Sequence, residues 1–129
     1  FENLGIKSNL NYVKGDDFKL SSLYKNASLY VSLSIHEGFG LTLLEAMRSK
    51  CPVLCSNIPV FKEIYKNSCE YVNSKDLKSI KKGLEKVLKS SKKQKSLLFK
   101  SKKIVKKLTW QQCALKTSKI YRNIHKYEK

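Results

Sequence analysis

Two carboxylates and two glycines lie close together in this 129-residue chain. Glu37 comes directly before Gly38-Phe39-Gly40, and Glu45 follows shortly after. Glycines let backbone N–H groups approach a ligand closely, and a helix beginning near Leu41 or Thr42 would add unpaired N–H groups and a partial positive charge. A diphosphate fits such an anion site, and carboxylates accept hydrogen bonds from vicinal hydroxyls. The segment therefore suits a nucleotide sugar.

The same segment also has a purely structural interpretation. Thr42-Leu43-Leu44-Glu45 matches a capping box, in which Glu45 would only satisfy a backbone donor at the start of a helix. Pairs of glycines before a helix are common in α/β folds. Spacing alone leaves both interpretations open.

The elements around this segment indicate an α/β fold. Short runs rich in β-forming residues predict strands at 10–13, 29–33, 52–55 and 70–72. Helices are predicted up to Ala27, with Asp16 or Asp17 as the N-cap, and also over 41–47 and 60–65. Because strands and helices alternate, we expect a Rossmann-like parallel sheet with helices on both faces.

The second half of the chain is predicted to be helical. From Asp76 onward, apolar residues recur at helical spacing between lysines, and these apolar stripes must cover another surface. We expect Trp110 and Tyr121 to anchor the tail helices against the domain. Ser90 to Lys95 is the most loop-like stretch, and Gly83 weakens its helix by about 1 kcal/mol relative to alanine.

Several motifs in this chain resemble those of family 4 glycosyltransferases. Glu37 to Met47 is similar to the family's E-x7-E signature, with Glu37 and Glu45 as its two acids. Further segments resemble other family motifs in family order, over about residues 10–121: Leu23-Tyr24-Lys25-Asn26-Ala27, Cys51-Pro52-Val53-Leu54-Cys55-Ser56-Asn57, Glu63-Ile64, Asp76-Leu77 with Ile80, and Leu108-Thr109-Trp110 with Ala114. The chain thus resembles the C-terminal, donor-binding part of a retaining, group 1 type enzyme with the GT-B fold.

This resemblance implies transfer of a hexosyl-type sugar, with retention, from a nucleotide-sugar donor to a glycan or glycolipid acceptor. Glu37 would be the catalytic residue beside the reacting centre. Glu45 would accept hydrogen bonds from the ribose, and backbone amides would hold the sugar and the diphosphate. The implied donor-binding residues are Gly38, Phe39, Gly40, Leu41 and Glu45. No metal or other cofactor is expected, because the helix dipole and basic groups would stabilise the leaving phosphate.

The resemblance also implies a domain organisation. Residues 1–129 would form the nucleotide-sugar-binding domain, with 76–129 as its helical tail. The N-terminal acceptor domain would be absent from the chain and would be its partner, so we expect the fragment alone to be inactive. Lys50 stands where the family often has glycine. A left-handed helix end at Lys50 would cost about 1 kcal/mol.

The formal charge of +17 comes almost wholly from lysine, because Arg48 and Arg122 are the only arginines. The charge is consistent with lysines on solvated helix faces. It is also consistent with an anionic membrane surface, to which each lysine is attracted by roughly 1 kcal/mol. Nucleic acid is a third alternative, although its recognition favours arginine. No apolar run approaches the roughly 20 residues of a membrane-spanning helix. The four cysteines lack zinc or disulfide spacing and suggest a reducing compartment.

We therefore expect a cytoplasmic protein that contacts the inner membrane face and has no nucleic-acid partner. Two other functions remain open on the sequence alone. One is a non-catalytic nucleotide-sugar-binding module, and the other is a basic nucleic-acid-binding domain.

Overall fold

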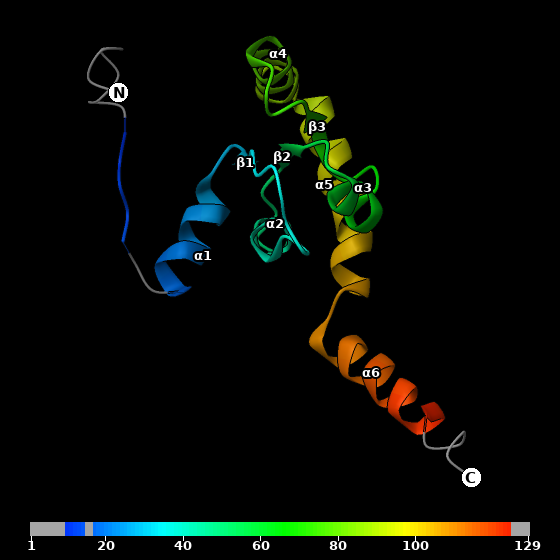
Figure 1. The fold of residues 1–129 in the computed structure, drawn as a ribbon. Helices are drawn as coiled ribbons and strands as arrows, with labels where there is room; N and C mark the ends of the chain where they lie inside the picture. The colour runs from blue at the N-terminus through cyan, green and yellow to red at the C-terminus, as the bar shows by residue number, and fades with distance from the viewer. Residues whose placement is uncertain (1–9, 15–16, 125–129) are drawn as a thin grey trace.

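The computed structural model describes residues 10–14 and 17–124, and its strands form one parallel sheet (Figure 1). The strands β1 (Tyr30–Ser32), β2 (Val53–Ser56) and β3 (Glu70–Val72) lie in the order β1-β2-β3. Val31 of β1 is in register with Leu54 of β2, and Leu54 with Glu70 of β3. The predicted α/β class with a parallel sheet is confirmed.

Three helices lead into the strands. α1 (Asp17–Asn26) precedes β1, α2 (Leu41–Arg48) connects β1 to β2, and α3 (Pro59–Tyr65) connects β2 to β3. All three lie where the sequence predicts helices. α3 begins with Pro59, whose fixed backbone angle suits a first helical position. Asp17 is the first residue of α1, and the alternative N-cap, Asp16, lies outside the described residues.

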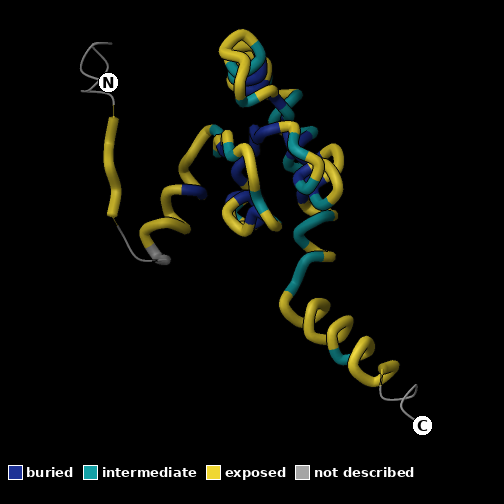
Figure 2. The backbone as a smooth tube through the Cα atoms, in the orientation of Figure 1, coloured by how far each residue is buried: buried dark blue, intermediate teal, exposed yellow. Residues whose placement is uncertain are grey.

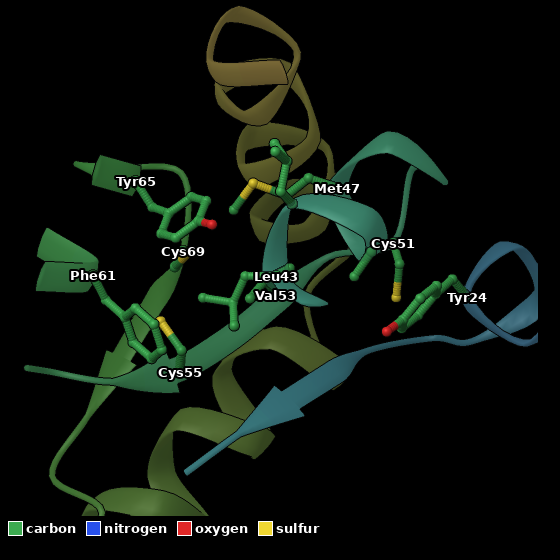
Figure 3. Packing of buried hydrophobic residues seen from close by; sticks show 11 residues of the cluster. Tyr24, Leu43, Met47, Cys51, Val53, Cys55, Phe61, Tyr65 and Cys69 are labelled. Atoms are coloured by element: carbon green, nitrogen blue, oxygen red, sulfur yellow. The ribbon is translucent and has the colours of Figure 1, made fainter. Parts of the chain in front are cut away.

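Helices cover both faces of the sheet, as predicted. On one face, Val53 and Cys55 belong to a core cluster with side chains from α2 and α3 (Figure 3). On the other face lies α4 (Leu77–Leu88), where a Cβ at Gly83 would come within 2.4 Å of Val72 Cγ1 and 3.0 Å of Leu54 Cδ1. Gly83 therefore lets α4 approach the sheet closely, which offsets its poor helix propensity.

The predicted helical tail is confirmed. α5 (Ser91–Lys107) packs against α2 and α4, and α6 (Trp110–Ile124) extends away from the sheet (Figure 1). The loop predicted at Ser90 to Lys95 is wrong, because Ser90 Oγ accepts a hydrogen bond from the Lys93 N–H at 3.2 Å and caps α5. No described helix combines the length and apolar character that crossing a bilayer requires.

Two other expectations are wrong. Trp110 and Tyr121 do not anchor the tail, since they are 76% and 70% exposed, and most of α6 extends away from the other described elements (Figure 2). The segment 10–13 is not a strand. It lies apart from the sheet with Tyr12 almost fully exposed, and a strand needs a neighbour to accept and donate its backbone hydrogen bonds.

The end of α2 is left-handed at Lys50, which is the conformation for which a cost of lysine was considered from the sequence. Lys50 has a φ of 60°. Its N–H donates to the Met47 carbonyl at 3.1 Å, and the Cys51 N–H donates to the Ala46 carbonyl at 2.9 Å. These two bonds are those of a Schellman motif, in which glycine is favoured at the position that Lys50 occupies.

Replacing Lys50 with glycine is expected to raise the free energy of unfolding by about 1 kcal/mol, because glycine adopts the left-handed conformation without a Cβ penalty. Urea denaturation measures the change. Ser49→Gly is the matched control, since Ser49 has a φ of −78° and glycine there should be destabilising. Stabilisation by both variants would contradict a specific strain at Lys50.

A buried carboxylate ties the sheet to the tail. Glu70 Oε1 lies 2.6 Å from Lys86 Nζ, and Glu70 Oε2 lies 2.6 Å from Lys93 Nζ. Burial acts to raise the pKa of Glu70, but the hydrogen bonds and positive charges of the two lysines outweigh it, so the pKa is lowered. The two ion pairs thus join β3 to α4 and α5.

The lowered pKa predicts a contribution to stability that is present above the ordinary glutamate pKa and is lost as the pH falls through the folded-state value. Glu70→Gln should reduce the free energy of unfolding at pH 7 by about 1 to 2 kcal/mol, and the difference from the wild type should shrink toward pH 3. Urea denaturation across this range tests it. The control Glu85→Gln removes only the exposed pair with Lys89, which should cost less than about 0.5 kcal/mol. An equal loss at pH 3 and pH 7 would contradict the charge-based account.

Candidate functional site

The segment from Glu37 to Gly40 lies between the carboxyl end of β1 and the start of α2. In open parallel sheets, ligands bind at the carboxyl ends of the strands, where loops meet helix N-termini. The structure therefore places the predicted glycine turn and the helix that follows it at the edge where such a sheet takes its ligand.

Gly40 is required by the fold itself. Its φ of 82° and ψ of 56° are left-handed, and a Cβ would lie 2.6 Å from Cε1 of the buried Phe61 ring. The Tyr65 hydroxyl donates a hydrogen bond to the Gly40 carbonyl at 2.7 Å. Phe61 and Tyr65 both come from α3 and belong to the core cluster (Figure 3). The start of α2 is thus fixed by a neighbouring helix.

Gly38 differs from Gly40, because packing does not require it. It is exposed, and an added Cβ would meet no atom within 4 Å. The backbone at Gly38 therefore borders open space, which leaves room for a ligand to approach the N–H groups of the turn.

The N-terminus of α2 presents free amide groups. The N–H groups of Leu43 and Leu44 donate to the Gly40 carbonyl at 3.0 and 3.4 Å. Those of Leu41 and Thr42 lie in the first turn, where no helical carbonyl precedes them. No acidic residue stands in this turn, and Leu41 is about half exposed. The arrangement is suited to an anion.

The capping-box interpretation is not supported by this geometry. The residue that caps α2 is Gly40 rather than Thr42, and no side chain accepts a hydrogen bond at the cap. Glu45 lies in the second turn of α2, so it does not satisfy a backbone donor at the helix start. Its carboxylate is available for another role.

Glu37 is held by a neighbouring hydroxyl. Ser34 Oγ donates to Glu37 Oε1 at 3.1 Å, and Ser32 Oγ lies 3.4 Å from Ser34 Oγ. Ser32 is the last residue of β1, so this chain of polar groups runs from the sheet to the carboxylate. Glu37 is half-buried, and its position is thereby tied to a rigid element.

Glu45 is exposed and has a partner on α1. The Tyr24 hydroxyl donates to Glu45 Oε2 at 3.5 Å. Burial raises the pKa of Tyr24 to about 12, with further contributions from Tyr30 and Glu45, so the hydroxyl keeps its proton at neutral pH. The Tyr24 ring packs edge-on against Tyr30 with 5.4 Å between centroids. Tyr24 therefore acts as a donor that orients the Glu45 carboxylate, and the carboxylate remains the acceptor for the hydroxyl groups of a ligand.

Three residues of the site escaped the sequence analysis, namely Tyr24, Ser34 and Tyr65. Tyr24 lies in a motif that the family resemblance had singled out, but the motif gave it no partner. Ser34 is three residues from Glu37 and could have been considered as its hydrogen-bond donor. Tyr65 carries no local signal, because the carbonyl to which it donates is 25 residues earlier in the chain.

A groove of about 590 Å³ runs along α2 and the start of α6. Arg48 Nη2 donates to the Leu108 carbonyl at 3.1 Å and holds the two walls together. The groove is lined by Phe39, Leu41, Leu44, Glu45, Arg48, Lys107, Leu108, Thr109, Trp110, Gln112, Cys113 and Lys116. Three predicted donor-binding residues therefore share one cavity. In the described part of the chain, no three His, Cys, Asp or Glu side chains are grouped to hold a metal ion.

Comparison with known proteins gives a consistent result. Residues 1–103 match the family described as glycosyl transferases group 1. The chain is 39% identical, over 85 residues, to the O-antigen chain mannosyltransferase RfbU of Salmonella typhimurium, which covers 65% of this chain and 24% of that protein. It is 29% identical, over 113 residues, to the O-antigen chain mannosyltransferase B of Escherichia coli, covering 88% of this chain and 29% of that protein.

A solved structure resembles the whole fold. Sucrose-phosphate synthase from Thermosynechococcus elongatus superposes with a TM-score of 0.84 at 21% identity, covering 98% of this chain and 33% of that one. At this identity the likeness concerns the fold alone. In each of these proteins, the chain spans between about a quarter and a third of the length.

Proposed function

The chain belongs to the group 1 family of glycosyl transferases, and we propose that it binds the nucleotide-sugar donor of a retaining transferase. Its fold is the C-terminal half of a GT-B fold. The observation that carries the proposal is the open backbone at Gly38 beside the free N–H groups that begin α2. A carboxylate stands on either side of this anion site, as a nucleotide sugar requires.

In this proposal the diphosphate lies against the amides of Gly38, Phe39, Gly40 and Leu41. The positive end of the α2 dipole and these N–H groups stabilise its charge, so no metal is needed. Glu45 lies about 6 Å further along the helix at 1.5 Å per residue, where its carboxylate accepts hydrogen bonds from the ribose. The groove beside Glu45 has the size of a small-molecule site and takes the nucleoside.

Glu37 is the residue that contacts the donor sugar next to the reacting carbon. The bond between the anomeric carbon and the diphosphate oxygen breaks, and its electron pair stays on the phosphate. The acceptor hydroxyl attacks from the same face, which retains the configuration, and its proton passes to the leaving phosphate oxygen. The carboxylate of Glu37, positioned by Ser34, stabilises the positive charge that develops on the sugar ring.

The sugar and the acceptor are proposed from the relatives. Two of them are named as O-antigen chain mannosyltransferases, so we propose transfer of a mannose-like hexose to a glycan or glycolipid. Transfer also needs a second domain that binds the acceptor, and we propose that the 129 residues bind the donor without turning it over. A cytoplasmic location, where nucleotide sugars are available, follows from the same proposal.

Isothermal titration of the chain with UDP and GDP tests the donor site. One of the two should bind at least tenfold more tightly than its nucleoside, because charge-assisted hydrogen bonds contribute about 1.5 to 3 kcal/mol each. Inorganic pyrophosphate is the control for attraction to a chain of charge +17. If pyrophosphate bound as tightly as both nucleotides, there would be no nucleotide site.

A further inference from the structure

The positive charge of this chain is concentrated where acidic residues are absent. Between Lys86 and Tyr127 there is no aspartate or glutamate. α5 lies within this stretch, and each of its eight cations is a lysine: Lys92, Lys93, Lys95, Lys100, Lys102, Lys103, Lys106 and Lys107. Of these, Lys93 forms an ion pair with Glu70, and no described acidic group forms an ion pair with the other seven. Of the eight, Lys107 lines the groove proposed for the donor, and the other seven do not.

Six of the eight exposed residues of α5 fall within one narrow stripe. Lys92, Lys95, Phe99, Lys102, Lys103 and Lys106 are all exposed. At 100° per residue they lie within an arc of about 100°, and at 1.5 Å per residue they extend over about 21 Å. The opposite face buries Leu97 and Ser101 at 1% and 4% exposure. α5 is therefore fixed in the domain by one face, and its outer stripe of five lysines around one phenylalanine points to solvent.

Phe99 distinguishes this stripe from an ordinary solvated face. Its ring is 68% exposed in the middle of the stripe, with Lys103 Nζ 5.4 Å from the ring centroid. An apolar ring surrounded by lysines suits a bilayer interface, where the ring enters the headgroup region and the ammonium groups meet lipid phosphates. Nucleic acid is less suited to it, because α5 has no arginine for bidentate contacts.

From this geometry we infer that the outer stripe of α5 (Lys92, Lys95, Phe99, Lys102, Lys103 and Lys106) docks on the surface of an anionic lipid bilayer. The attraction is charge-based and local, since it falls off within roughly 10 Å at ordinary ionic strength. Because the stripe runs along one side of a single helix, all of its side chains can meet the same flat surface. This inference does not depend on the donor site, whose groove is lined by none of the residues of the stripe.

Co-sedimentation with vesicles tests it. The full chain should bind vesicles of phosphatidylcholine with 30% phosphatidylglycerol and should not bind pure phosphatidylcholine. The variant Lys95→Gln/Lys102→Gln/Lys103→Gln should lose on the order of 100-fold in partitioning, at about 1 kcal/mol per lysine. The control Lys78→Gln/Lys81→Gln/Lys82→Gln removes the same charge from exposed positions of α4 and should lose less than tenfold.

Phe99 provides the second measurement. In a Trp110→Phe background, Phe99→Trp should show a blue shift of its emission on anionic vesicles and none on neutral ones. The inference would be overturned if the α4 and α5 variants lost vesicle partitioning equally, or if the emission of the Phe99→Trp variant did not shift on anionic vesicles. The inference would also be overturned if a 20-nucleotide DNA bound the chain more tightly than the vesicles do and if the α5 substitutions weakened binding of the DNA and of the vesicles equally. Glu37→Ala should bind vesicles like the wild type, so failure of the donor site and failure of the bilayer surface are distinguishable.

Discussion

Replacing Gly40 with alanine is expected to lower the free energy of unfolding by about 3 kcal/mol and to abolish nucleotide binding. The left-handed backbone costs roughly 1 to 2 kcal/mol for a residue with a Cβ. The contact at 2.6 Å with the Phe61 ring adds a further 1 to 3 kcal/mol of overpacking, because Phe61 is fully buried and cannot move aside. Urea denaturation measures the stability, and titration with the nucleotide measures the binding.

Gly38→Ala is the matched control for this prediction. Its Cβ would meet open space, so the free energy of unfolding should change by less than about 0.5 kcal/mol. Nucleotide binding should still weaken, because the methyl group occupies the space through which a ligand reaches the backbone. Equal destabilisation by the two variants would contradict the roles assigned to the two glycines. Wild-type binding by Gly38→Ala would place the ligand elsewhere.

The two carboxylates are expected to act on different parts of the donor. Glu45→Ala should weaken binding of the nucleoside diphosphate by about 10- to 100-fold, since hydrogen bonds to a charged group contribute about 1.5 to 3 kcal/mol. Glu37→Ala should leave binding of the nucleoside diphosphate unchanged and weaken only the binding of the complete nucleotide sugar. Titrating each variant with the nucleotide alone and with the nucleotide sugar separates the two effects.

Neither substitution should affect the fold. Glu45 is exposed and its described partner is the Tyr24 hydroxyl at 3.5 Å, and alanine is a good helix former. Glu37 is half-buried, and its loss leaves Ser34 able to bond water. Thermal unfolding should therefore match the wild type for both variants. If Glu37→Ala weakened binding of the nucleotide alone as much as Glu45→Ala, the assignment of sugar and ribose to the two acids would be wrong.

The sequence predicted the elements that depend on local signals. Asp76 caps α4, with Oδ1 accepting from the Lys78 N–H at 2.9 Å, and Thr109 Oγ1 accepts from the Gln112 N–H at 3.2 Å at the start of α6. Both residues lie in motifs that carried the family resemblance. Caps, glycine turns and apolar periodicity act over three or four residues, which is why the strand, turn and helix around Gly38 could be located before the structure was known.

The contacts that hold the site could not be predicted in this way. Tyr65 reaches the Gly40 carbonyl and Tyr24 reaches Glu45 across 25 and 21 residues of sequence. Whether they meet depends on how α1 and α3 pack against α2, and no local pattern encodes that packing. The prediction of a strand at 10–13 is wrong for the same reason. Its alternation is typical of a strand, but a strand forms only where a neighbouring strand is available.

The measurement that tests the donor site most directly is the change in backbone ¹H–¹⁵N chemical shifts when the nucleoside diphosphate is added. The largest changes should fall on the amides of Gly38, Phe39, Gly40 and Leu41 and on Glu45, and Glu45→Ala should reduce them at the same ligand concentration. Changes confined to the lysine-rich helices α5 and α6, with the turn at 37–40 unaffected, would contradict a nucleotide-sugar site at the start of α2.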